Sequence, residues 1–465
     1  MAKTYMGVRL RRLREERGMT QAALSRVLGI SPSYLNQIEQ NQRPLTVPVL
    51  LKLNGAFGLD VQLFSDDEEA RLITDLRVAL ADQGTGASMV EVRELAANMP
   101  GVARAIVDMQ RRLRETSERA DLLAGRLTMP AVGMPAAFEA VRDWFYTRRN
   151  YVTDLDKAAE VIGAALPPGR MLTGLIDRLA GRHGIRIAQS QDGDALRHYD
   201  PAGRILRLAG HLSAGQQAFQ IATQLAFLEQ EGTILRLAED PDLSAEAQSL
   251  LRIGLANYFA GALILPYRRF LETAEDLQYD IELLARAFGV GFETTCHRLS
   301  TLQRPEARGI PFFFIRVDRA GNISKRQSAT DFHFSRMGGS CPLWNVYEAF
   351  ARPAEILRQV TQMPDGRSYL WIARMVRQTQ GGFGTAAKTF AIALGCDLAH
   401  AEKLVYARGL DLRNPDMATK IGPGCKVCER SGCPQRALPM VGRPLAVVDA
   451  EARFAPYSSG LGGAS

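Results

Sequence analysis

The stretch Ser31-Pro-Ser-Tyr-Leu-Asn-Gln-Ile-Glu-Gln40 decides the fold of the first part of this chain. Ser31 is a favoured N-cap residue, and Pro32 occupies the first helical position, where the missing N–H of proline costs nothing. One face of the expected helix is apolar and would be buried, with Tyr34, Leu35 and Ile38. The other faces carry short, uncharged, hydrogen-bonding side chains: Ser33, Asn36, Gln37 and Gln40. Because such side chains pair with base edges, the stretch predicts the second helix of a helix-turn-helix, which enters the DNA major groove.

The residues before this stretch complete the motif. Thr20 is positioned to cap a helix over residues 21–28, and Gly29 supplies the turn that follows it. The apolar spacing predicts that the inner face of this helix comprises Ala23, Leu24 and Val27. Gln21 is placed to meet a DNA phosphate, because backbone N–H groups and the helix dipole point there. The DNA-contacting residues predicted from the motif are Gln21, Ser31, Ser33, Tyr34, Asn36, Gln37 and Arg43.

Residues 5–64 resemble the lambda-repressor/XRE type of DNA-binding domain. The matching pattern is Leu10-Arg-x-Leu13, then Thr20-Gln-x-x-Leu24, then Gly29-Ile-Ser-x-Ser-Tyr-Leu-x-x-Ile-Glu39. The resemblance implies a head of five helices over residues 1–65 that binds a double-stranded DNA operator. A helical bundle without a DNA role is the alternative.

The charge distribution agrees with a DNA-binding end. The chain has a formal net charge of +7, and residues 1–62 hold nine Lys and Arg against four Asp and Glu. Residues 66–124 hold eight basic against twelve acidic residues. A basic head followed by an acidic segment favours nucleic-acid contact at the head rather than over the whole surface.

Composition also limits the class of protein. The apolar fraction of 46% is ordinary for a globular protein. No run of about 18 apolar residues is present, and the N-terminus lacks the apolar core of a signal peptide. We therefore expect a cytoplasmic protein that makes no use of a membrane. Six cysteines in such a chain favour metal binding or redox chemistry over a disulfide framework.

Residues 66–134 read as a helical arm and linker. Apolar stripes at helical spacing run along them, and the longest predicted helix covers residues 102–127. Such an arm could pair with a twin from a second subunit or pack on its own chain. DNA readers of this type occupy two half-sites, which favours a homodimer or a higher homo-oligomer. At the other end, residues 449–465 are rich in Ala, Ser and Gly, and we expect a disordered tail.

Residues 135–305 contain a second resemblance. The segments 219–227 and 256–266 look like the core of ImmA/IrrE-type zinc metallopeptidases, in which a helix carries His-Glu-x-x-His. Here Thr223 and Phe227 stand at the positions of the two histidines, and Gln224 stands at that of the glutamate. Leu255 replaces the family's third ligand, an acidic residue before Ala-Asn. We expect no zinc and no catalysis, so this region is predicted to be a scaffold and the chain not to be an enzyme.

Residues 306–448 begin with strand signals over residues 312–317 and 323–327, followed by 369–376 and 388–394. The predicted fold class is therefore mainly α, with an α+β C-terminal half. The sharpest chemical signal is Cys425-x-x-Cys428-x-x-x-x-Cys433-Pro434, because clustered thiolates hold zinc or an iron–sulfur cluster. Either normally needs a fourth ligand, and Cys341, also followed by proline in a loop, is the best candidate. Unliganded surface thiols are the alternative.

The motifs Cys341-Pro-Leu-Trp and Cys425-Lys-Val-Cys-Glu-Arg-x-x-Cys-Pro-Gln-Arg-Ala437 resemble the C-terminal domain of short-chain fatty acyl-coenzyme A regulators. Those proteins share the order of head, inactive peptidase-like middle and cysteine-bearing end. The resemblance implies a transcription factor for propionate, acetate-glyoxylate or related metabolism, with an acyl-CoA effector. It also implies a [4Fe-4S] cluster on the four cysteines, whereas spacing alone leaves a structural zinc equally open. Residues that bind the effector cannot be identified from the sequence.

Two other functions remain as alternatives. One is a redox-responsive or iron-responsive repressor that takes no acyl-CoA. The other is a zinc metallopeptidase that acts on a repressor partner, which the missing His-Glu-x-x-His set disfavours.

Overall fold

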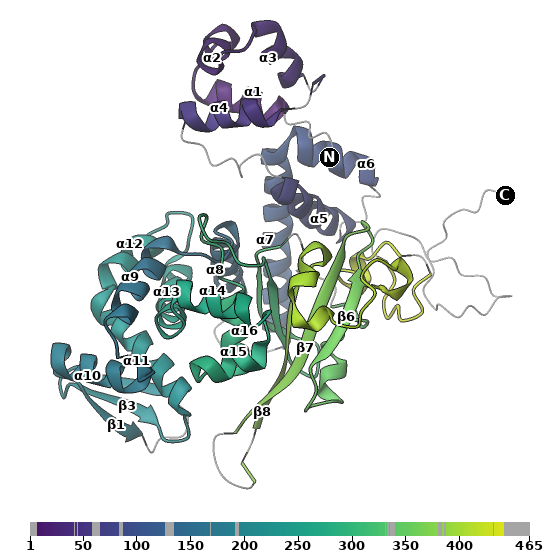
Figure 1. Cartoon of the computed structure of the whole chain (residues 1–465). Coiled ribbons are helices and arrows are strands. Elements are labelled where there is room, and N and C mark those ends of the chain that lie inside the picture. The colour runs from purple at the N-terminus through teal and green to yellow at the C-terminus, as the bar shows by residue number, and fades with distance from the viewer. Residues whose placement is uncertain are drawn as a thin grey trace, which may run out of the picture.

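The structure is a computed structural model, and it confirms the predicted class: mainly α, with an α+β C-terminal half (Figure 1). It describes residues 7–40, 42–43, 45–57, 66–82, 87–125, 134–167, 169–190, 195–330, 332, 334, 340–379, 384–385, 387–430 and 432–440. The expected tail over residues 449–465 lies outside these ranges. A small head, an arm of helices and a larger body follow one another in space in the order of the chain.

The head contains α1 (Gly7–Glu16), α2 (Gln21–Leu28), α3 (Pro32–Glu39) and α4 (Val47–Phe57). A fifth helix before the arm would have to lie in residues 58–65, outside the described residues. The core of the head is formed by Leu10, Leu24, Leu28, Leu35, Ile38, Leu45, Val49 and Leu53. The predicted inner face of α2 was partly wrong, because Val27 is 49% exposed. Leu24, Ser25 and Leu28 face inward instead, which turns Val27 toward solvent.

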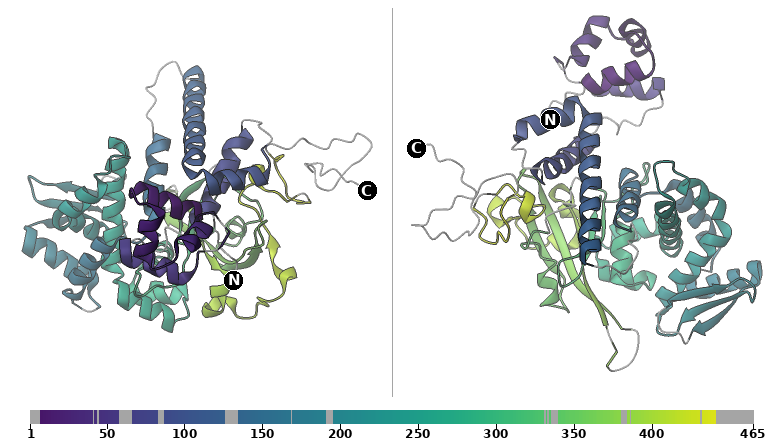
Figure 2. Two further views of the ribbon diagram at one scale, coloured as in Figure 1. Left: turned by 90° about the horizontal axis from the view of Figure 1, so that it is seen from above. Right: turned by 180° about the vertical axis from the view of Figure 1, so that it is seen from behind.

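The arm contains α5 (Asp66–Asp82), α6 (Met89–Asn98) and α7 (Pro100–Gly125). Ser88 begins α6 with a capping box, in which its hydroxyl accepts from the Glu91 N–H and Glu91 bonds back to the Ser88 N–H. Figure 2 shows α7 as a long helix that runs from the head side of the molecule along the body. The expected linker between arm and body falls mainly on residues 126–133, which are outside the described residues.

The middle domain wraps helices around the long buried helix α13. Its helices are α8 (Met134–Thr147), α9 (Thr153–Ala164), α10 (Met171–His183), α11 (Ala214–Glu229), α12 (Glu231–Ala238), α13 (Ala245–Ile264), α14 (Tyr267–Asp276), α15 (Ile281–Phe288) and α16 (Phe292–Leu299). A small sheet has the order β1-β3-β2, formed by β1 (Arg186–Ser190), β2 (Arg197–Asp200) and β3 (Ile205–Ala209). The predicted strands near residues 185–187 and 205–208 are confirmed. Strand β2 was not predicted, because its residues are mostly polar and form no apolar run.

The C-terminal domain is a six-stranded sheet in the order β5-β4-β8-β7-β6-β9. Its strands are β4 (Phe313–Val317), β5 (Ile323–Ser328), β6 (Leu357–Gln362), β7 (Ser368–Thr379), β8 (Ala387–Asp397) and β9 (Thr419–Lys420). Both predicted strand pairs exist, and β8 also pairs with β4, so the two hairpins form one sheet. Gly395 makes this pairing possible, because a Cβ at that position would lie 2.1 Å from the Phe313 ring.

Among the described residues, no single helix is long and apolar enough to cross a bilayer. Of the helices that the structure describes, one bent pair, α13–α14, meets the length and composition test when its two helices are taken together.

Candidate functional site

The helix-turn-helix has the local structure that the sequence predicts. The Ser31 hydroxyl accepts from the Tyr34 N–H at 3.1 Å, and the Thr20 hydroxyl accepts from the Ala23 N–H at 3.2 Å. Gly29 ends α2 in the left-handed region, with φ of 56°. Figure 1 shows α2 and α3 at the end of the head that is remote from the arm, which leaves their outer side open to a ligand.

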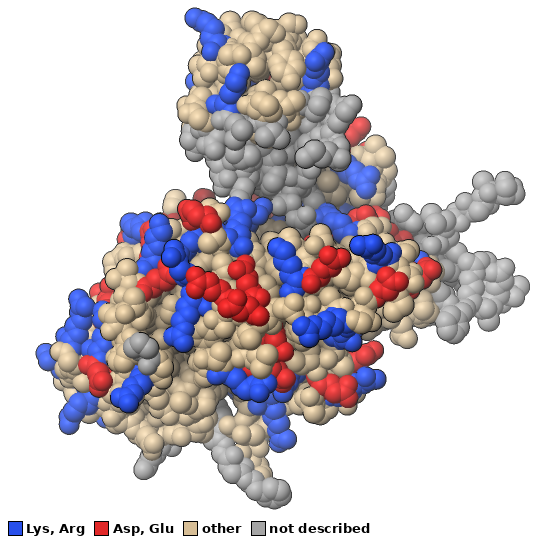
Figure 3. All heavy atoms as spheres, viewed as in Figure 1, with Lys and Arg blue, Asp and Glu red and all other residues tan. Residues whose placement is uncertain are grey.

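The predicted DNA-contacting residues on α3 lie at or near this surface. Ser31 and Ser33 are exposed, and Tyr34, Asn36 and Gln37 are partly exposed. The carbonyl oxygen of Gln37 accepts the Arg43 N–H at 3.1 Å, and the Arg43 guanidinium lies 5.7 Å from the Tyr34 ring centre. In Figure 3 the visible face of the head carries several Lys and Arg side chains, whereas acidic and basic side chains alternate over the body. Contact of these residues with DNA remains a prediction.

A buried ion pair joins the elements of the motif, and the sequence reading did not find it. Glu39 is 5% exposed and pairs with Arg14 of α1 at 2.7 Å, which raises the Arg14 pKa through this hydrogen bond. The Gln21 amide donates to the same carboxylate at 2.7 Å and to Asn36 at 3.2 Å. The Gln21 side chain therefore fixes α2 against α3, and a phosphate contact by that side chain would compete with these bonds.

Gln37→Ala is expected to weaken binding to the specific operator by about 1–3 kcal/mol, because a side chain that reads a base edge contributes this much. Binding to random DNA is expected to change little. Fluorescence anisotropy with both DNAs measures the difference at one salt concentration. An equal loss on both DNAs would mean that Gln37 touches only the backbone or that the head is misfolded.

The position of the former peptidase site contains no metal-binding side chain of that family. The Thr223 hydroxyl donates to the Phe219 carbonyl at 2.8 Å, within α11, and Leu255 is fully buried on α13. Gln224 stands where the catalytic glutamate would be, and its amide oxygen accepts from Arg197 of β2 at 3.0 Å. The Arg197 guanidinium also lies 5.5 Å from the Phe227 ring centre.

Arg197 places a positive charge at this position. Burial lowers its pKa, and no carboxylate of the described residues lies within ion-pair distance of its guanidinium. A half-buried guanidinium without a counter-charge favours an anion at the same place. The sequence reading missed Arg197 because β2 was not predicted and lies 27 residues from Gln224.

The four predicted cysteine ligands come together from two distant loops. Cys341, Cys425, Cys428 and Cys433 all line one small cavity. The Trp344 indole N–H donates to the Gly422 carbonyl at 3.2 Å and so joins the two loops. Gly422 lies so close that a Cβ there would be 2.5 Å from the Cys428 sulfur. Cys296 in α16 and Cys396 in β8 are fully buried elsewhere, as expected for core residues.

The surroundings of the cavity suit bound thiolates. Burial raises the pKa of Cys341 to about 11 and also raises that of Cys428, so these two thiols stay protonated at neutral pH when they hold no metal. A bound cation is what would convert them to thiolates. Arg436 is 5% exposed and donates to the carbonyl oxygens of Cys425 and Cys428 at 3.0 and 2.9 Å. Its charge would offset an anionic metal–thiolate group.

The donor set therefore fits a metal centre in composition and charge. Within the part of the chain that the structure describes, no group of three or more His, Cys, Asp or Glu is placed so that it could hold a metal ion. The four cysteines share the cavity without converging on a single point. The loop also contacts the arm, since Glu429 next to Cys428 pairs with Arg77 of α5 at 2.7 Å.

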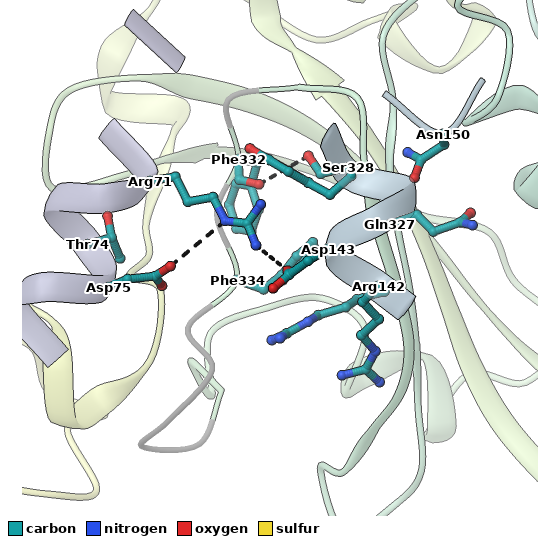
Figure 4. A pocket seen from close by; sticks show the side chains of 12 residues that line it. Arg71, Thr74, Asp75, Arg142, Asp143, Asn150, Gln327, Ser328, Phe332 and Phe334 are labelled. Atoms are coloured by element: carbon teal, nitrogen blue, oxygen red, sulfur yellow. Dashed lines mark hydrogen bonds and ion pairs between the residues drawn. The ribbon is translucent and has the colours of Figure 1, made fainter. Parts of the chain in front are cut away.

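A second pocket lies where the arm, α8 and β5 meet (Figure 4). Three arginines line it, and each is ion-paired with a carboxylate. Arg71 pairs with Asp143 and lies 4.0 Å from the Tyr146 ring centre, while Arg142 and Arg326 both contact Glu139 at 2.6 Å. These pairs fasten the arm and α8 to the sheet domain, and we assign the pocket no ligand.

Three family models match successive parts of the chain. Residues 10–64 match a helix-turn-helix model, residues 180–300 match the IrrE N-terminal-like domain, and residues 301–457 match the C-terminal domain of short-chain fatty acyl coenzyme A regulators.

Several full-length relatives are similar. The HTH-type transcriptional regulator PrpR of Mycobacterium tuberculosis is 51% identical, covering 98% of this chain and 96% of the relative. The HTH-type transcriptional regulator RamB of the same species is 50% identical, covering 98% and 99%. A propionyl-CoA carboxylase regulator of Cereibacter sphaeroides is 43% identical, covering 98% of each chain. A solved structure, a Mycobacterium tuberculosis transcriptional regulator, is 54% identical with a TM-score of 0.68, covering 70% of this chain and all of that one.

Proposed function

Because this chain belongs to the family of short-chain fatty acyl-coenzyme A regulators, we propose that it binds an acyl-CoA effector and holds a [4Fe-4S] cluster on Cys341, Cys425, Cys428 and Cys433. Its matches identify a DNA-binding transcriptional regulator of short-chain acyl metabolism. The acyl-CoA effector and the iron–sulfur cluster are our proposals beyond this assignment. We further propose that it binds its operator as two or more copies, since each head reads one half-site.

The meeting of four cysteines in one cavity carries the proposal of a cluster. They come from loops separated by more than 80 residues, and four cysteine thiolates are the ligand set of a [4Fe-4S] cluster or a structural zinc. When bound, the cluster would supply an iron-dependent and oxygen-sensitive cross-link between these loops. Two residues of this chain would support the cluster. Gly422 leaves room for the Cys428 sulfur because it has no side chain, and the Arg436 guanidinium places a positive charge next to the Cys428 backbone. A structural zinc on the same residues is the alternative.

The cationic side chain of Arg197, beside the position of the former peptidase site, supports the proposal of an acyl-CoA effector. Coenzyme A is polyanionic, and Arg197 offers a half-buried charge without a carboxylate partner among the described residues. A metallopeptidase function is not proposed, because Thr223, Gln224, Phe227 and Leu255 replace both the metal ligands and the general base.

Arg197→Met is expected to weaken acyl-CoA binding at least about tenfold, because a hydrogen bond to a charged group contributes about 1.5–3 kcal/mol. Isothermal titration calorimetry with propionyl-CoA measures the change. The matched control is Arg236→Met on α12, whose side chain is 62% exposed and pairs with Asp154, and its affinity should equal that of the wild type. Equal affinity in Arg197→Met and wild type would remove Arg197 from the effector site.

The experiment that tests the function is a titration of operator binding with acyl-CoA at fixed cluster content. The operator is first selected from genomic fragments by the purified protein. Propionyl-CoA and acetyl-CoA are then compared with free CoA and free propionate by fluorescence anisotropy. We expect an acyl-CoA to shift operator affinity while the free acid does not. If affinity follows only iron content or oxidation, the chain is a redox-responsive or iron-responsive repressor.

A further inference from the structure

The first helix of the arm, α5, is covered on two opposite sides. No residue from 71 to 80 is exposed. One side packs on α6 and α7 through Leu76, with Leu72, Ile73 and Leu80 beside it. Val78 is also buried, at 7% exposure, but it does not belong to this core. At about 100° per residue Val78 lies on the other side of the helix, so a part of the molecule outside the arm core covers it.

This second side of α5 faces the body. Its residues have the spacing i, i+3, i+4 and i+7 of one helical face: Arg71, Thr74, Asp75 and Val78. The first three line the pocket between the arm, α8 and β5. In Figure 4 the Arg71 side chain reaches from α5 to Asp143 of α8. Its guanidinium also lies 4.0 Å from the ring centre of Tyr146, one turn further along α8. An ion pair and a stacked ring together fix the direction of this arginine and hold α5 against α8.

A second arginine joins α5 to a different part of the body. Arg77 pairs at 2.7 Å with Glu429, in the loop that contains Cys428. The four side chains of the two pairs are only 19% to 34% exposed, so solvent screens them incompletely. Six residues separate Arg71 from Arg77, which places their Cα atoms about 9 Å apart along the helix axis. Because the two contacts are separated in this way, α5 cannot pivot about either one.

The position of α5 limits where the DNA-binding head can lie. Figure 1 shows the arm between the head and the body. Helix α4 ends at Phe57 and α5 begins at Asp66, so eight residues join them. Eight residues span at most about 29 Å at full extension. Two half-sites one helical turn apart have centres separated by about 34 Å. The place where α5 is fixed to the body therefore restricts the half-site positions that each head can reach.

We propose that Arg71 and Arg77 are positioning residues for operator binding, because they fix α5 on the body and so set the separation of the two heads. This inference rests on the proposed function in one respect, namely that two copies bind one operator, whatever surface joins them. The two arginines act on half-site spacing and leave base recognition by α3 unchanged.

The test compares the full-length wild type with Arg71→Met/Arg77→Met by fluorescence anisotropy. The DNAs are a single half-site, the operator, and the operator lengthened between its half-sites by half a helical turn, about five base pairs. The wild type should bind the lengthened operator at least about tenfold more weakly than the operator, because linked sites bind together only where the link permits. The variant should bind the operator at least about tenfold more weakly than the wild type does, and should lose less than about threefold on lengthening. Both proteins should bind the single half-site equally well.

The matched control is Arg111→Met, because Arg111 lies in the same arm and pairs within α7, with Asp108 at 2.9 Å. It should behave like the wild type on every DNA. The exchanged pair Arg77→Glu/Glu429→Arg should recover the spacing preference that Arg77→Glu alone loses. Hydrogen exchange without DNA, followed by mass spectrometry, gives a readout that needs no second copy. The amides of residues 71–80 should exchange at least about tenfold faster in Arg71→Met/Arg77→Met and at the wild-type rate in Arg111→Met.

Two results would overturn the proposal: a wild-type spacing preference in Arg71→Met/Arg77→Met, or wild-type exchange of residues 71–80 in that variant. A different result would reject the proposed function on which it rests. If the wild type bound a single half-site as tightly as the whole operator, binding by two copies would be wrong, and the positioning role would fall with it.

Discussion

Replacing Cys428 with serine is expected to remove the metal centre altogether. Cys428 lies between Cys425 and Cys433 in the loop that supplies three of the four thiols lining the cavity. A cube of four irons needs one thiolate at each iron. Burial already raises the pKa of the Cys428 thiol, so a serine hydroxyl at this position stays protonated and does not replace the thiolate ligand. Anaerobically purified wild type should be brown with about four irons per chain, and Cys428→Ser should be colourless with almost none.

Cys341→Ser should have a different effect, because Cys341 comes from the other loop. Three thiolates from the 425–433 loop can still hold a cluster, but one iron is then open to water and oxygen. We expect a labile or three-iron cluster, measured by iron content and electron paramagnetic resonance. Cys296→Ala and Cys396→Ala are the matched controls, because both thiols are fully buried away from the cavity, and these variants should keep about four irons per chain.

Two outcomes would contradict this assignment. A colourless anaerobic wild type with about one zinc per chain, bound through the same cysteines, would replace the cluster with a structural zinc site. A full and stable cluster in Cys341→Ser would reject Cys341 as the fourth ligand. Loss of the centre should also lower thermal stability, because a metal that binds only the folded state adds its binding free energy to folding.

The second large effect is expected from Asp156→Ala in the middle domain. Asp156 has no exposed surface and accepts from both terminal nitrogens of Arg298 at 2.8 and 3.1 Å. The Tyr258 hydroxyl donates to the same carboxylate at 2.6 Å and itself accepts the Val152 N–H at 3.1 Å. Removal of the carboxylate leaves the buried guanidinium of Arg298 without its counter-charge. We expect a loss of about 3–5 kcal/mol in the free energy of unfolding.

Urea denaturation followed by circular dichroism measures this loss. The matched control is Asp154→Ala on the same helix, because the pair between Asp154 and Arg236 is more than half exposed on both sides. Such surface pairs contribute about 0–1 kcal/mol, so this variant should unfold almost like the wild type. The double variant Asp156→Leu/Arg298→Met removes both charges and should be more stable than Asp156→Ala alone. A loss below about 1 kcal/mol in Asp156→Ala would show that the charge is compensated in another way.

The local structure of the head could be predicted because its determinants are close in sequence. The caps by Thr20 and Ser31 each involve an N–H three residues further on, and Gly29 needs only its own backbone freedom. The exception was Val27, because the rotation of a short helix depends on what packs against it. Leu24 and Leu28 are the leucines of α2 that are buried, and the sequence of α2 alone does not show which of its apolar residues face the core.

The sequence predicted which kinds of residue form the candidate sites, but it predicted little of how those residues are arranged in space. The spacing of Cys425, Cys428 and Cys433 indicated a thiolate centre, and the substituted His-Glu-x-x-His positions indicated a peptidase fold without its chemistry. Arg197 was not predicted because its hydrogen bond to Gln224 of α11 depends on the position of strand β2. No spacing rule links a residue of β2 to a helix that begins after another strand.

The sequence by itself determined the helix-turn-helix, the strand pairs of the C-terminal half and the loss of the peptidase residues, because each is encoded within a turn, a hairpin or one helical face. The tertiary structure decided which distant groups meet. It placed β8 between β4 and β7, set Arg298 on Asp156 across 142 residues and brought the Cys341 loop to the Cys425 loop. The physical reason is that burial makes such contacts strong, since a charge or thiol removed from water must be satisfied by whatever the fold brings within reach.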